Sequence, residues 1–387
     1  MSSENWRCYT LGEICSFTGG TVFPQKVQGD TQGTVPFIKV SDFNINGNER
    51  WIVNANNYVY QEDIKKLNAK LHPAYATVFA KIGIALTFNR RRLLLVNTII
   101  DNNLASAKPY QEIIDPIYFY YLLLTIDFNK VISGTAVPYL NFSDLQKIEV
   151  TIPDISTQRR IAEILSALDD KIELNRQTNA TLEAVAQALF KEWFVHFNFP
   201  GADGELVDSE LGPIPKGWRV GRLGEVCELV YGKGLTSETR IEGRYPVVGS
   251  NGIVGTHNDY LVEGPGIVIG RKGTIGEVTW VHQNFFPIDT TFYINDLLGI
   301  NGLYFHYFLL KEQDFKKIAS DSAVPGLNRN QAYASLIVIP TKDAINQYNN
   351  FAQTIFAGIF NYSNESSTLA AIRDALLPKL MNGEIEV

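Results

Sequence analysis

The chain has 387 residues, 45% of them hydrophobic and 12% aromatic, so it can bury ordinary cores, and its length suggests two or three domains. A net charge of −7 argues against a uniformly basic surface that coats DNA, although residues 1–153 and 218–340 are each within one charge of neutral. The three cysteines fit neither a disulfide framework nor a metal pattern, which favours a cytoplasmic location. We expect no membrane span and no export signal.

Residues 1–153 read as a globule that contains a sheet. After "LGEIC" at 11–15, short runs rich in Val, Ile, Phe and Tyr are broken by Gly and Asn, which indicates strands and turns. Residues 118–133 predict a helix, and the segment ends with "AVPYLNFSDLQKIEVTIP" at 136–153.

Residues 154–197 predict one long helix, unbroken from 158 to 194, with Ser156 or Thr157 as its cap. Apolar residues alternate at spacings of four and three for about four heptads, which is typical of a coiled-coil seam. The seam consists of Ile161, Leu165, Leu168, Ile172, Asn175, Asn179, Leu182, Ala186 and Leu189.

Residues 198–217, rich in Gly, Pro and acidic residues, have the composition of a linker. The earlier motifs then return. "LGEVC" at 223–227 repeats "LGEIC", and 323–340 repeats 136–153 with seven of eighteen residues identical, 187 positions later. Residues 305–320 match the helical segment 118–133 at the same offset. So long a period indicates duplicated domains, with the second globule at 218–340.

Residues 341–387 predict a second long helix, which Pro378 and Gly383 end. Both helices carry polar residues at their centres, and buried Asn fixes the register of paired helices. We expect an antiparallel pair, because a parallel one would force residues 195–217 to run back along the whole helix. Alternatively, Asn175 and Asn179 face solvent or a partner. The expected seam on the second helix contains Ile355, Ile359, Tyr362, Leu369 and Leu376.

Catalytic signatures are missing from the sequence. The glycine-rich stretch "GPGIVIGRKGTIG" at 264–276 matches no phosphate-binding motif and indicates a strand, a turn and a strand. Histidine spacing suggests no metal site, and no motif of an amino-methyltransferase or a serine hydrolase occurs. We expect no catalytic and no metal-binding residues.

Four motifs, in this order, carry a family resemblance: "QRRIAEILSALDDKIELNRQTNATLEAVAQALFKEWF" at 158–194, "LGPIPKGWRVGRLGEV" at 211–226, "GRKGTIG" at 270–276 and "LLPKLMNGEI" at 376–385. With these motifs and the duplication, the chain resembles the specificity subunits of Type I restriction-modification systems. The resemblance implies an α+β fold, with two target recognition domains at opposite ends of a pair of long antiparallel helices that form a pseudo-twofold repeat.

The resemblance also implies a function without catalysis. Each recognition domain would read one half of a bipartite, asymmetric site in double-stranded DNA, and the helices would act as a spacer ruler. Two methyltransferase subunits and, through them, restriction subunits would join the complex. No cofactor would be bound by this chain, because S-adenosylmethionine, ATP and Mg would belong to those partners.

Base reading requires polar or charged side chains on loops, with phosphate contacts nearby. Lys81 and Arg271 occupy corresponding points of "KIG" and "RKG". The DNA-contact candidates are Lys39, Ser41, Lys81, Arg90, Arg91, Thr135, Tyr139 and Asn141 in the first globule, and Ser250, Asn251, His257, Arg271, Lys272, Thr274, Asn328 and Arg329 in the second.

Two other functions remain open from the residues alone. One is a two-headed adaptor that binds proteins or glycans, and the other is a self-contained nuclease. The aromatic stretch "KEWFVHFNF" at 191–199 is either a docking surface for a partner or the core at a helix end.

Overall fold

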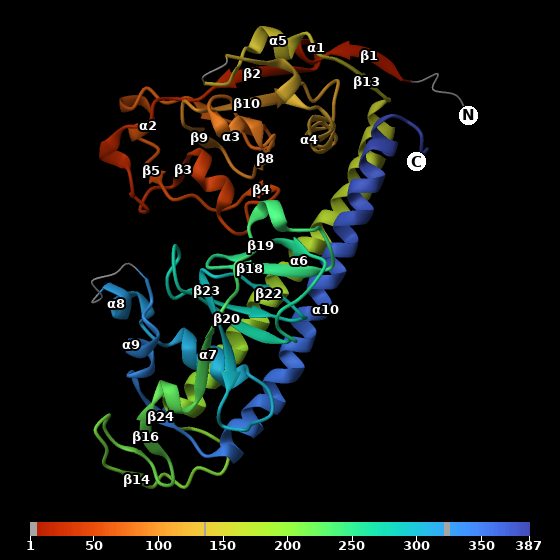
Figure 1. The fold of residues 1–387 in the computed structure, drawn as a ribbon. Coiled ribbons are helices and arrows are strands. Elements are labelled where there is room, and N and C mark those ends of the chain that lie inside the picture. The colour runs from red at the N-terminus through yellow and green to blue at the C-terminus, as the bar shows by residue number, and fades with distance from the viewer. Residues whose placement is uncertain (1–5, 135–136, 321–325) are drawn as a thin grey trace. The chain divides into compact units, whose positions relative to one another are not determined.

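The computed structural model describes residues 6–134, 137–320 and 326–387. The chain forms two compact units, and both contain part of each of two long helices, α6 (Ile155–Phe194) and α10 (Lys342–Met381) (Figure 1). Unit 1 comprises residues 1–175 and 365–387, and unit 2 comprises residues 176–364. The boundary therefore falls near the middle of both helices.

Unit 1 contains the first thirteen strands and the short helices between them. Its strands are β1 (Arg7–Thr10), β2 (Cys15–Gly19), β3 (Val35–Ile38), β4 (Trp51–Ile52), β5 (Tyr58–Val59), β6 (Leu71–His72), β7 (Thr77–Ala80), β8 (Arg91–Leu94), β9 (Thr98–Ile100), β10 (Leu104–Pro109), β11 (Ile132–Ser133), β12 (Tyr139–Leu140) and β13 (Glu149–Ile152). Its short helices are α1 (Leu11–Ile14), η2 (Gln25–Val27), η3 (Val40–Asn44), α2 (Asp63–Lys66), α3 (Ile84–Thr87), α4 (Pro116–Thr125), η4 (Phe128–Val131) and α5 (Phe142–Gln146).

Two sheets form the body of unit 1. The larger has the order β2-β10-β7-β8-β4, and the smaller has the order β5-β3-β9-β6. Strands β1 and β13 pair as an antiparallel ribbon that brings residues 7–10 beside 149–152, so the two ends of the globule meet where α6 begins.

The helix α4 packs into the main core of unit 1, where Tyr118 and Tyr121 are fully buried. Asp115 caps α4 by accepting bonds from the N–H groups of Ile117 and Tyr118, and Pro116 occupies the first turn, where it costs no hydrogen bond. The predicted helix 118–133 is wrong in its length, because α4 ends at Thr125 and Asp127 caps the separate turn η4.

Unit 2 repeats this plan with fewer strands. Its strands are β14 (Leu206–Val207), β15 (Ile214–Pro215), β16 (Arg219–Arg222), β17 (Cys227–Tyr231), β18 (Tyr245–Gly249), β19 (Gly252–His257), β20 (Gly266–Gly270), β21 (Val278–Val281), β22 (Phe286–Pro287), β23 (Thr291–Asp296) and β24 (Leu336–Ile339). Its short helices are η5 (Leu223–Glu225), η6 (Ser237–Thr239), α7 (Tyr304–Lys311), α8 (Phe315–Ser320) and α9 (Arg329–Tyr333).

The sheets of unit 2 follow the same order as those of unit 1. The order β17-β23-β20-β21 parallels β2-β10-β7-β8, and a three-stranded sheet β19-β18-β22 takes the place of the smaller sheet. Strands β16 and β24 form the ribbon that corresponds to β1 and β13. The predicted strand, turn and strand at 264–276 is confirmed by the antiparallel pairing of β20 with β21. As in unit 1, the predicted helix 305–320 is broken, here into α7 and α8.

Within unit 1 the long helices run antiparallel, as expected. The Asn175 amide donates to Glu365 at 2.8 Å and to Ser366 at 3.3 Å, while Asp169, earlier on α6, pairs with Arg373, later on α10, at 2.5 Å. Asn175 is buried, so the alternative in which it faces solvent is wrong.

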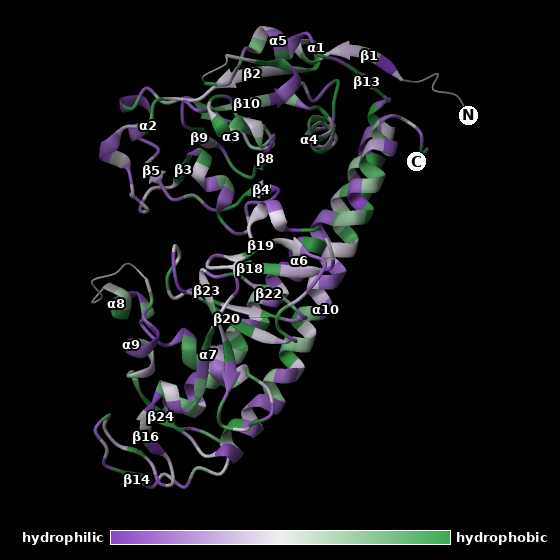
Figure 2. Ribbon diagram, viewed as in Figure 1, coloured by the Kyte–Doolittle hydropathy of each residue, from purple (hydrophilic) through white to green (hydrophobic). Residues whose placement is uncertain are grey.

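Within unit 2 the same antiparallel sense holds. The Asn179 amide donates to Ser363 Oγ at 3.1 Å, and the Tyr348 hydroxyl donates to the carbonyl of Ala186 at 3.0 Å. Figure 2 shows hydrophilic and hydrophobic residues interspersed along both helices, as a seam with a polar centre requires.

The expected seam residues are covered to different degrees. Those buried are Ile161, Leu165, Asn175, Ala186 and Ile355. Those half-buried are Leu168, Ile172, Asn179, Leu182, Leu189, Ile359, Tyr362, Leu369 and Leu376.

Two expectations about the helix ends are wrong. Helix α6 is capped by Asp154, which accepts bonds from the N–H groups of Ser156 and Thr157, because the helix begins at Ile155 and both hydroxyl residues already lie in its first turn. Helix α10 continues through Pro378 to Met381, so only Gly383, with a φ of 75° just after the last helical residue, fits the expected end. A proline deletes one backbone bond of the preceding turn, and packing of Leu380 and Met381 into the core of unit 1 holds the last turn in place.

Candidate nucleic-acid interface

In unit 1, Lys81 directly follows β7, and its backbone N–H donates to the carbonyl of Asn103 at 2.8 Å. The Lys81 ammonium lies 5.9 Å from the centre of the Phe142 ring. A Cβ atom added at Gly19 would come within 3.0 Å of that ammonium, so the glycine leaves room for the end of the lysine. Gly19 ends β2, Lys81 follows β7 and Phe142 begins α5, so three segments contribute to one cluster.

The segment 138–141 runs beside this cluster. Leu140 N–H donates to the carbonyl of Lys81 at 3.0 Å, and Tyr139 pairs with Ile82. Tyr139 is 42% exposed, while the Asn141 amide donates to Ser133 and Asp144. Lys81, Tyr139 and Asn141 are thus brought together, whereas Thr135 lies outside the described residues.

The other candidates of unit 1 lie around η3. Lys39 precedes this turn, and its ammonium sits 3.9 Å above the Phe23 ring. Ser41 is exposed on η3. Arg90 donates to the Asn44 side chain at 2.6 Å, which draws its guanidinium to the end of the same turn.

Arg91 is a correction to the DNA-contact candidates. It is 1% exposed and lies 3.9 Å from the centre of the Phe128 ring, and its guanidinium donates to the carbonyls of Asn89 and Ile126. Burial lowers its pKa to about 10. Because β8 turns alternate side chains to opposite faces, Arg91 points into the protein and its role is structural.

In unit 2, the loop between β20 and β21 is held tightly by its backbone. Arg271 and Lys272 both donate from their N–H groups to the carbonyl of Thr290, and Leu327 N–H donates to the carbonyl of Arg271. A Cβ atom at Gly270 would lie 2.1 Å from the carbonyl oxygen of Thr274, so only glycine allows this closure. The loop therefore presents Lys272, which is exposed, and Thr274, which is half-buried, from a rigid frame.

Tyr231, at the end of β17, was not among the sequence candidates. Two guanidinium groups lie near its ring, with that of Arg271 5.0 Å and that of Arg329 5.1 Å from the ring centre, and Tyr231 remains 46% exposed. An aromatic residue that ends a strand directly before Gly232 was the only available signal. Such a ring is suited to stacking against a base or sugar, and the two guanidinium groups are suited to contact either base edges or phosphates.

The remaining candidates of unit 2 lie in three places. Ser250 and Asn251 form the turn between β18 and β19, and a Cβ atom at Gly273 would touch Ser250 Oγ, so this turn adjoins the 271–277 loop. Asn328 caps α9 through its side chain. His257 is a correction, because it is 9% exposed at the far end of β19 and its Nδ1 lies against the backbone of Ile241.

The two clusters occupy equivalent places in the duplicated fold. Lys81 and Arg271 each follow equivalent strands, β7 and β20, while Gly19 and Tyr231 end β2 and β17. Phe142 and Arg329 are the corresponding residues 187 positions apart. Unit 1 thus combines a glycine, a lysine and an aromatic ring where unit 2 combines an aromatic ring and two arginines.

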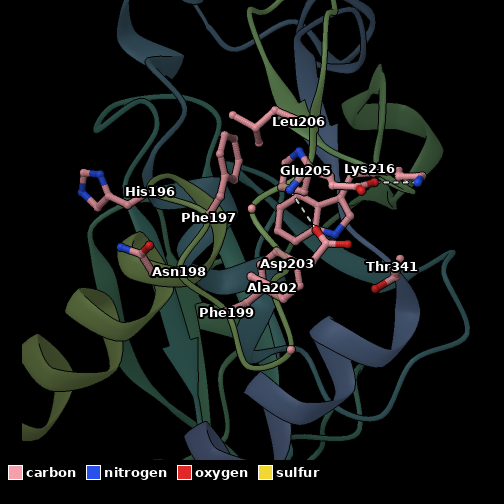
Figure 3. A pocket seen from close by; sticks show the side chains of 14 residues that line it. His196, Phe197, Asn198, Phe199, Ala202, Asp203, Glu205, Leu206, Lys216 and Thr341 are labelled. Atoms are coloured by element: carbon pink, nitrogen blue, oxygen red, sulfur yellow. Dashed lines mark hydrogen bonds and ion pairs between the residues drawn. The ribbon is translucent and has the colours of Figure 1, made fainter.

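Unit 2 also contains an aromatic pocket of about 290 Å³ next to the linker (Figure 3). Phe199 stacks on Trp218 with ring centres 4.9 Å apart, and Phe197 meets Trp218 edge-on at 5.6 Å. Further back, Phe190 and Phe194 are buried in the core of unit 2. The stretch 191–199 is therefore helix-end core at its start and lines a pocket at its end.

The described residues offer little for covalent or metal chemistry. They contain no group of three His, Cys, Asp or Glu side chains arranged to hold a metal ion. Burial raises the pKa of the Cys15 and Cys227 thiols to about 12, which keeps them protonated. No helix in the described part of the chain is long and apolar enough to cross a membrane.

Comparison with known proteins gives a consistent match. The family model described as "Type I restriction modification DNA specificity domain" matches residues 3–184 and 215–376. The Type I restriction enzyme MjaIX specificity subunit of Methanocaldococcus jannaschii is 27% identical over 420 residues, covering 99% of this chain and 94% of that protein. The HindI specificity subunit of Haemophilus influenzae is 27% identical over 484 residues, covering 99% and 100%.

Among solved structures, the S subunit of a Type I restriction-modification system from M. genitalium is similar, with a TM-score of 0.58. Its sequence is 18% identical, and the match covers 98% of this chain and 97% of that one. A sequence identity of 18% supports a similarity in fold alone.

Proposed function

We propose a DNA-reading role from one premise: this chain belongs to the Type I restriction modification DNA specificity family. It is a specificity subunit, the recognition component that leaves catalysis to other chains. Unit 1 reads one half of a bipartite, asymmetric DNA site and unit 2 reads the other. The antiparallel helices act as the spacer between the two halves.

One observation carries this proposal. A cluster lies at the same strand ends in each unit of the duplicated fold, but the two clusters differ in chemistry, with half-buried Lys81 and Phe142 in one and Tyr231, Arg271 and Arg329 in the other. A shared frame with different side chains suits two half-sites of different sequence. A bidentate arginine contact with guanine discriminates bases by ~1–3 kcal/mol, so unit 2 is suited to a guanine-containing half-site.

The remaining exposed candidates fit the neighbourhood of DNA. Lys272 is suited to phosphate contact, while Tyr139 and Asn251 are suited to groove contacts. A net charge of −7 means that this chain alone supplies little positive potential. Partner subunits therefore provide much of the attraction for the DNA backbone, and affinity is high only in the assembled complex.

Two methyltransferase subunits dock on the long helices, one in each unit. Ile164 and Ile372 are 39% and 44% exposed in unit 1, and Phe351 and Val185 are 48% and 46% exposed in unit 2. Phe351 follows Ile164 by 187 positions, and Ile372 follows Val185 by the same number, so the two apolar pairs are repeat-equivalent. Duplicated apolar patches suit two copies of one partner.

The neighbouring ion pair supports this pairing of side chains. Lys171 of α6 contacts Glu365 of α10 at 3.2 Å. One heptad earlier on α6 is Ile164, and one heptad later on α10 is Ile372, so an antiparallel pair brings these two residues opposite each other. By the same spacing, Val185 lies opposite Phe351.

The reactions of the complex belong to these partners. The methyltransferase subunits bring S-adenosylmethionine and modify one adenine in each half-site, and restriction subunits bring the ATP- and Mg-dependent activity. Family membership favours DNA over the protein or glycan ligands that an adaptor would bind.

The test is co-expression of this chain with its methyltransferase subunit, followed by mapping of methylated adenines in the host genome. We expect a single motif with two specified parts, a fixed unspecified spacer and one methylated adenine in each part. Methylation that is independent of this chain, or a motif without a spacer, would overturn the proposal.

A further inference from the structure

The helix that follows the main sheet in unit 1 is fastened to the long helices by a buried carboxylate. Tyr121 of α4 is fully buried, and its hydroxyl donates to Asp169 Oδ2 at 2.5 Å. Asp169 Oδ1 accepts a bond from Arg373 of α10, also at 2.5 Å. One side chain thus joins the globule to both long helices of unit 1, and we call these three residues the first clamp.

A second contact between the globule and α6 lies next to the first clamp. Arg50, which follows η3, pairs with Asp170 at 2.7 Å and donates to Ser166 Oγ at 3.0 Å. Its guanidinium also lies 5.7 Å from the Tyr121 ring. The body of the globule is therefore fixed to α6 at two neighbouring points.

Unit 2 has a clamp of the same chemistry in a different place. The Tyr307 hydroxyl of α7 donates to Glu183 Oε1 at 2.7 Å, and the Lys311 ammonium reaches the same oxygen at 2.7 Å. Tyr307 is 5% exposed. We call Tyr307, Lys311 and Glu183 the second clamp.

The duplication shows that the first clamp is not required for folding of such a unit. At the repeat-equivalent positions of Tyr121, Asp169 and Arg373, unit 2 has Phe308, Phe356 and Ala186. The rings of Phe308 and Phe356 pack edge-on at 6.0 Å, and Ala186 is fully buried. An apolar contact therefore serves the packing that charges and hydrogen bonds serve in unit 1.

The reverse comparison holds for the second clamp. Its members Tyr307, Glu183 and Lys311 correspond to Tyr120, Ala370 and Leu124 in unit 1. Each unit therefore has a polar clamp, and the two clamps occupy different positions of the repeat.

Polar clamps differ from apolar contacts because their hydrogen bonds and ion pairs depend on the relative orientation of the groups. Apolar surfaces slide or tilt at small cost, whereas a buried carboxylate that loses its donors pays the full desolvation penalty. A globule held by a polar clamp therefore has one preferred angle on its helices. One base pair of DNA advances by only ~3.4 Å, so a small tilt changes which spacer a reading unit fits.

We propose that the two clamps are positioning devices that fix the angle of each reading unit on the long helices and thereby restrict the DNA spacer to one length. This inference rests on the proposed function. It assigns a specificity role to residues that do not contact DNA.

The experiment uses the complete complex with its methyltransferase subunits and a set of DNA duplexes. All duplexes carry the same two half-sites, and the spacer is the natural length or is longer or shorter by one or two base pairs. The measured quantity is the initial methylation rate on each duplex. For Tyr121→Phe we expect near-normal methylation at the natural spacer and a roughly tenfold loss of discrimination against neighbouring spacers, because one hydrogen bond to a charged group is lost.

Tyr118→Phe is the matched control. Tyr118 lies on the same helix and is fully buried, and its hydroxyl bonds to none of the described residues. The substitution therefore removes the same atom from the same environment without touching the clamp. We expect its spacer profile to remain that of the unaltered complex.

Lys311→Met and Lys311→Arg test the second clamp without altering a buried group, since Lys311 is partly exposed. The methionine variant should broaden the spacer profile, and the arginine variant should restore it. The clamps have no such role if both tyrosine variants behave alike, or if Tyr121→Phe and Lys311→Met slow all spacers equally. If no duplex with two half-sites is methylated by the unaltered complex, the proposed function itself fails instead.

Discussion

The side-chain amide of Asn175 donates to Glu365 Oε2 at 2.8 Å, across the two long helices of unit 1. Lys171 reaches the same carboxylate oxygen at 3.2 Å, so Glu365 receives donors from two positions about one helical turn apart. These bonds hold the pKa of Glu365 below its usual value, with Asn175 as the main cause. A seam of leucines has no such bond to define which residues meet.

Replacing Asn175 should separate stability from register. We expect Asn175→Leu to raise the denaturation midpoint, because a buried apolar residue replaces a polar one, and to weaken the fixed register of the helices. The readout is disulfide formation between cysteines introduced at 164 and 372, which leave Lys171, Asn175 and Glu365 in place, and its yield should fall in the leucine variant. Leu168→Ile, at another seam position, is the control. An unchanged cross-linking yield would contradict a registering role for Asn175.

Substitution in one cluster should change only one half-site. Arg271→Ala and Tyr231→Ala remove a cation and the ring that it stacks on, and we expect each to cost ~1–3 kcal/mol of discrimination in the half read by unit 2. The other half of the methylated motif should stay unaltered. Sequencing of methylated adenines gives both halves at once.

Lys81→Ala is the reciprocal variant and should relax the half read by unit 1. Arg244→Ala is a control, because Arg244 is an exposed arginine of unit 2 and was not a candidate. A change in both halves from any single variant would contradict separate reading by the two units.

The apolar pairs on the long helices predict stepwise assembly. Ile164→Ser should remove one methyltransferase subunit from the complex, Phe351→Ser should remove one, and the double variant should remove both, since each exposed side chain contributes contact area at its own patch. Native mass spectrometry counts the bound subunits.

Leu174→Ser is the matched control for these variants. Leu174 is 55% exposed on α6, but its repeat-equivalent residue is Asn361, so it belongs to no duplicated patch. We expect the full complement of two subunits with this variant. Loss of both subunits from Ile164→Ser alone would show that the two patches are not independent.

The pair of buried His306 and half-buried Asp296 in unit 2 predicts an acid-dependent loss of stability. Burial opposes ionisation of Asp296, but the bond from His306 at 3.2 Å and the N–H groups of Leu298 and Ile300 outweigh it and lower the pKa of Asp296 to about 2. A carboxyl whose pKa is lower in the folded state stabilises the fold above its unfolded pKa of ~3.9. That contribution is lost as the pH falls toward 2.

The variant Asp296→Asn should therefore be less stable than the unaltered chain at pH 5 and should approach it as the pH falls from 4 toward 2. Urea denaturation followed by tryptophan fluorescence at each pH measures the difference. Asp289→Asn serves as control. A stability difference that is constant from pH 5 to pH 2 would show that the Asp296 charge contributes nothing.

The long-range organisation of this chain could be predicted from its sequence because the motifs repeat. The shared motifs 187 positions apart predict the duplicated fold, the heptad seam predicts a pair of long helices, and the short connection at 195–217 predicts their antiparallel sense. The burial and the neighbours of single side chains could not be predicted in this way, because they depend on the folded structure around them. Arg90 and Arg91 are adjacent in sequence, but strand alternation buries only Arg91. Tyr231 joins Arg271 and Arg329 only through folding, since the three are far apart along the chain.

The division of the chain has a consequence for its synthesis on the ribosome. Unit 1 needs residues 365–387, and its core contains Leu380 and Met381, which are translated long after residue 175. During elongation, unit 2 can close around its own segment while the earlier globule still lacks one wall. A chain truncated after residue 364 would thus have a first globule with an exposed apolar surface, which chaperones and proteases recognise.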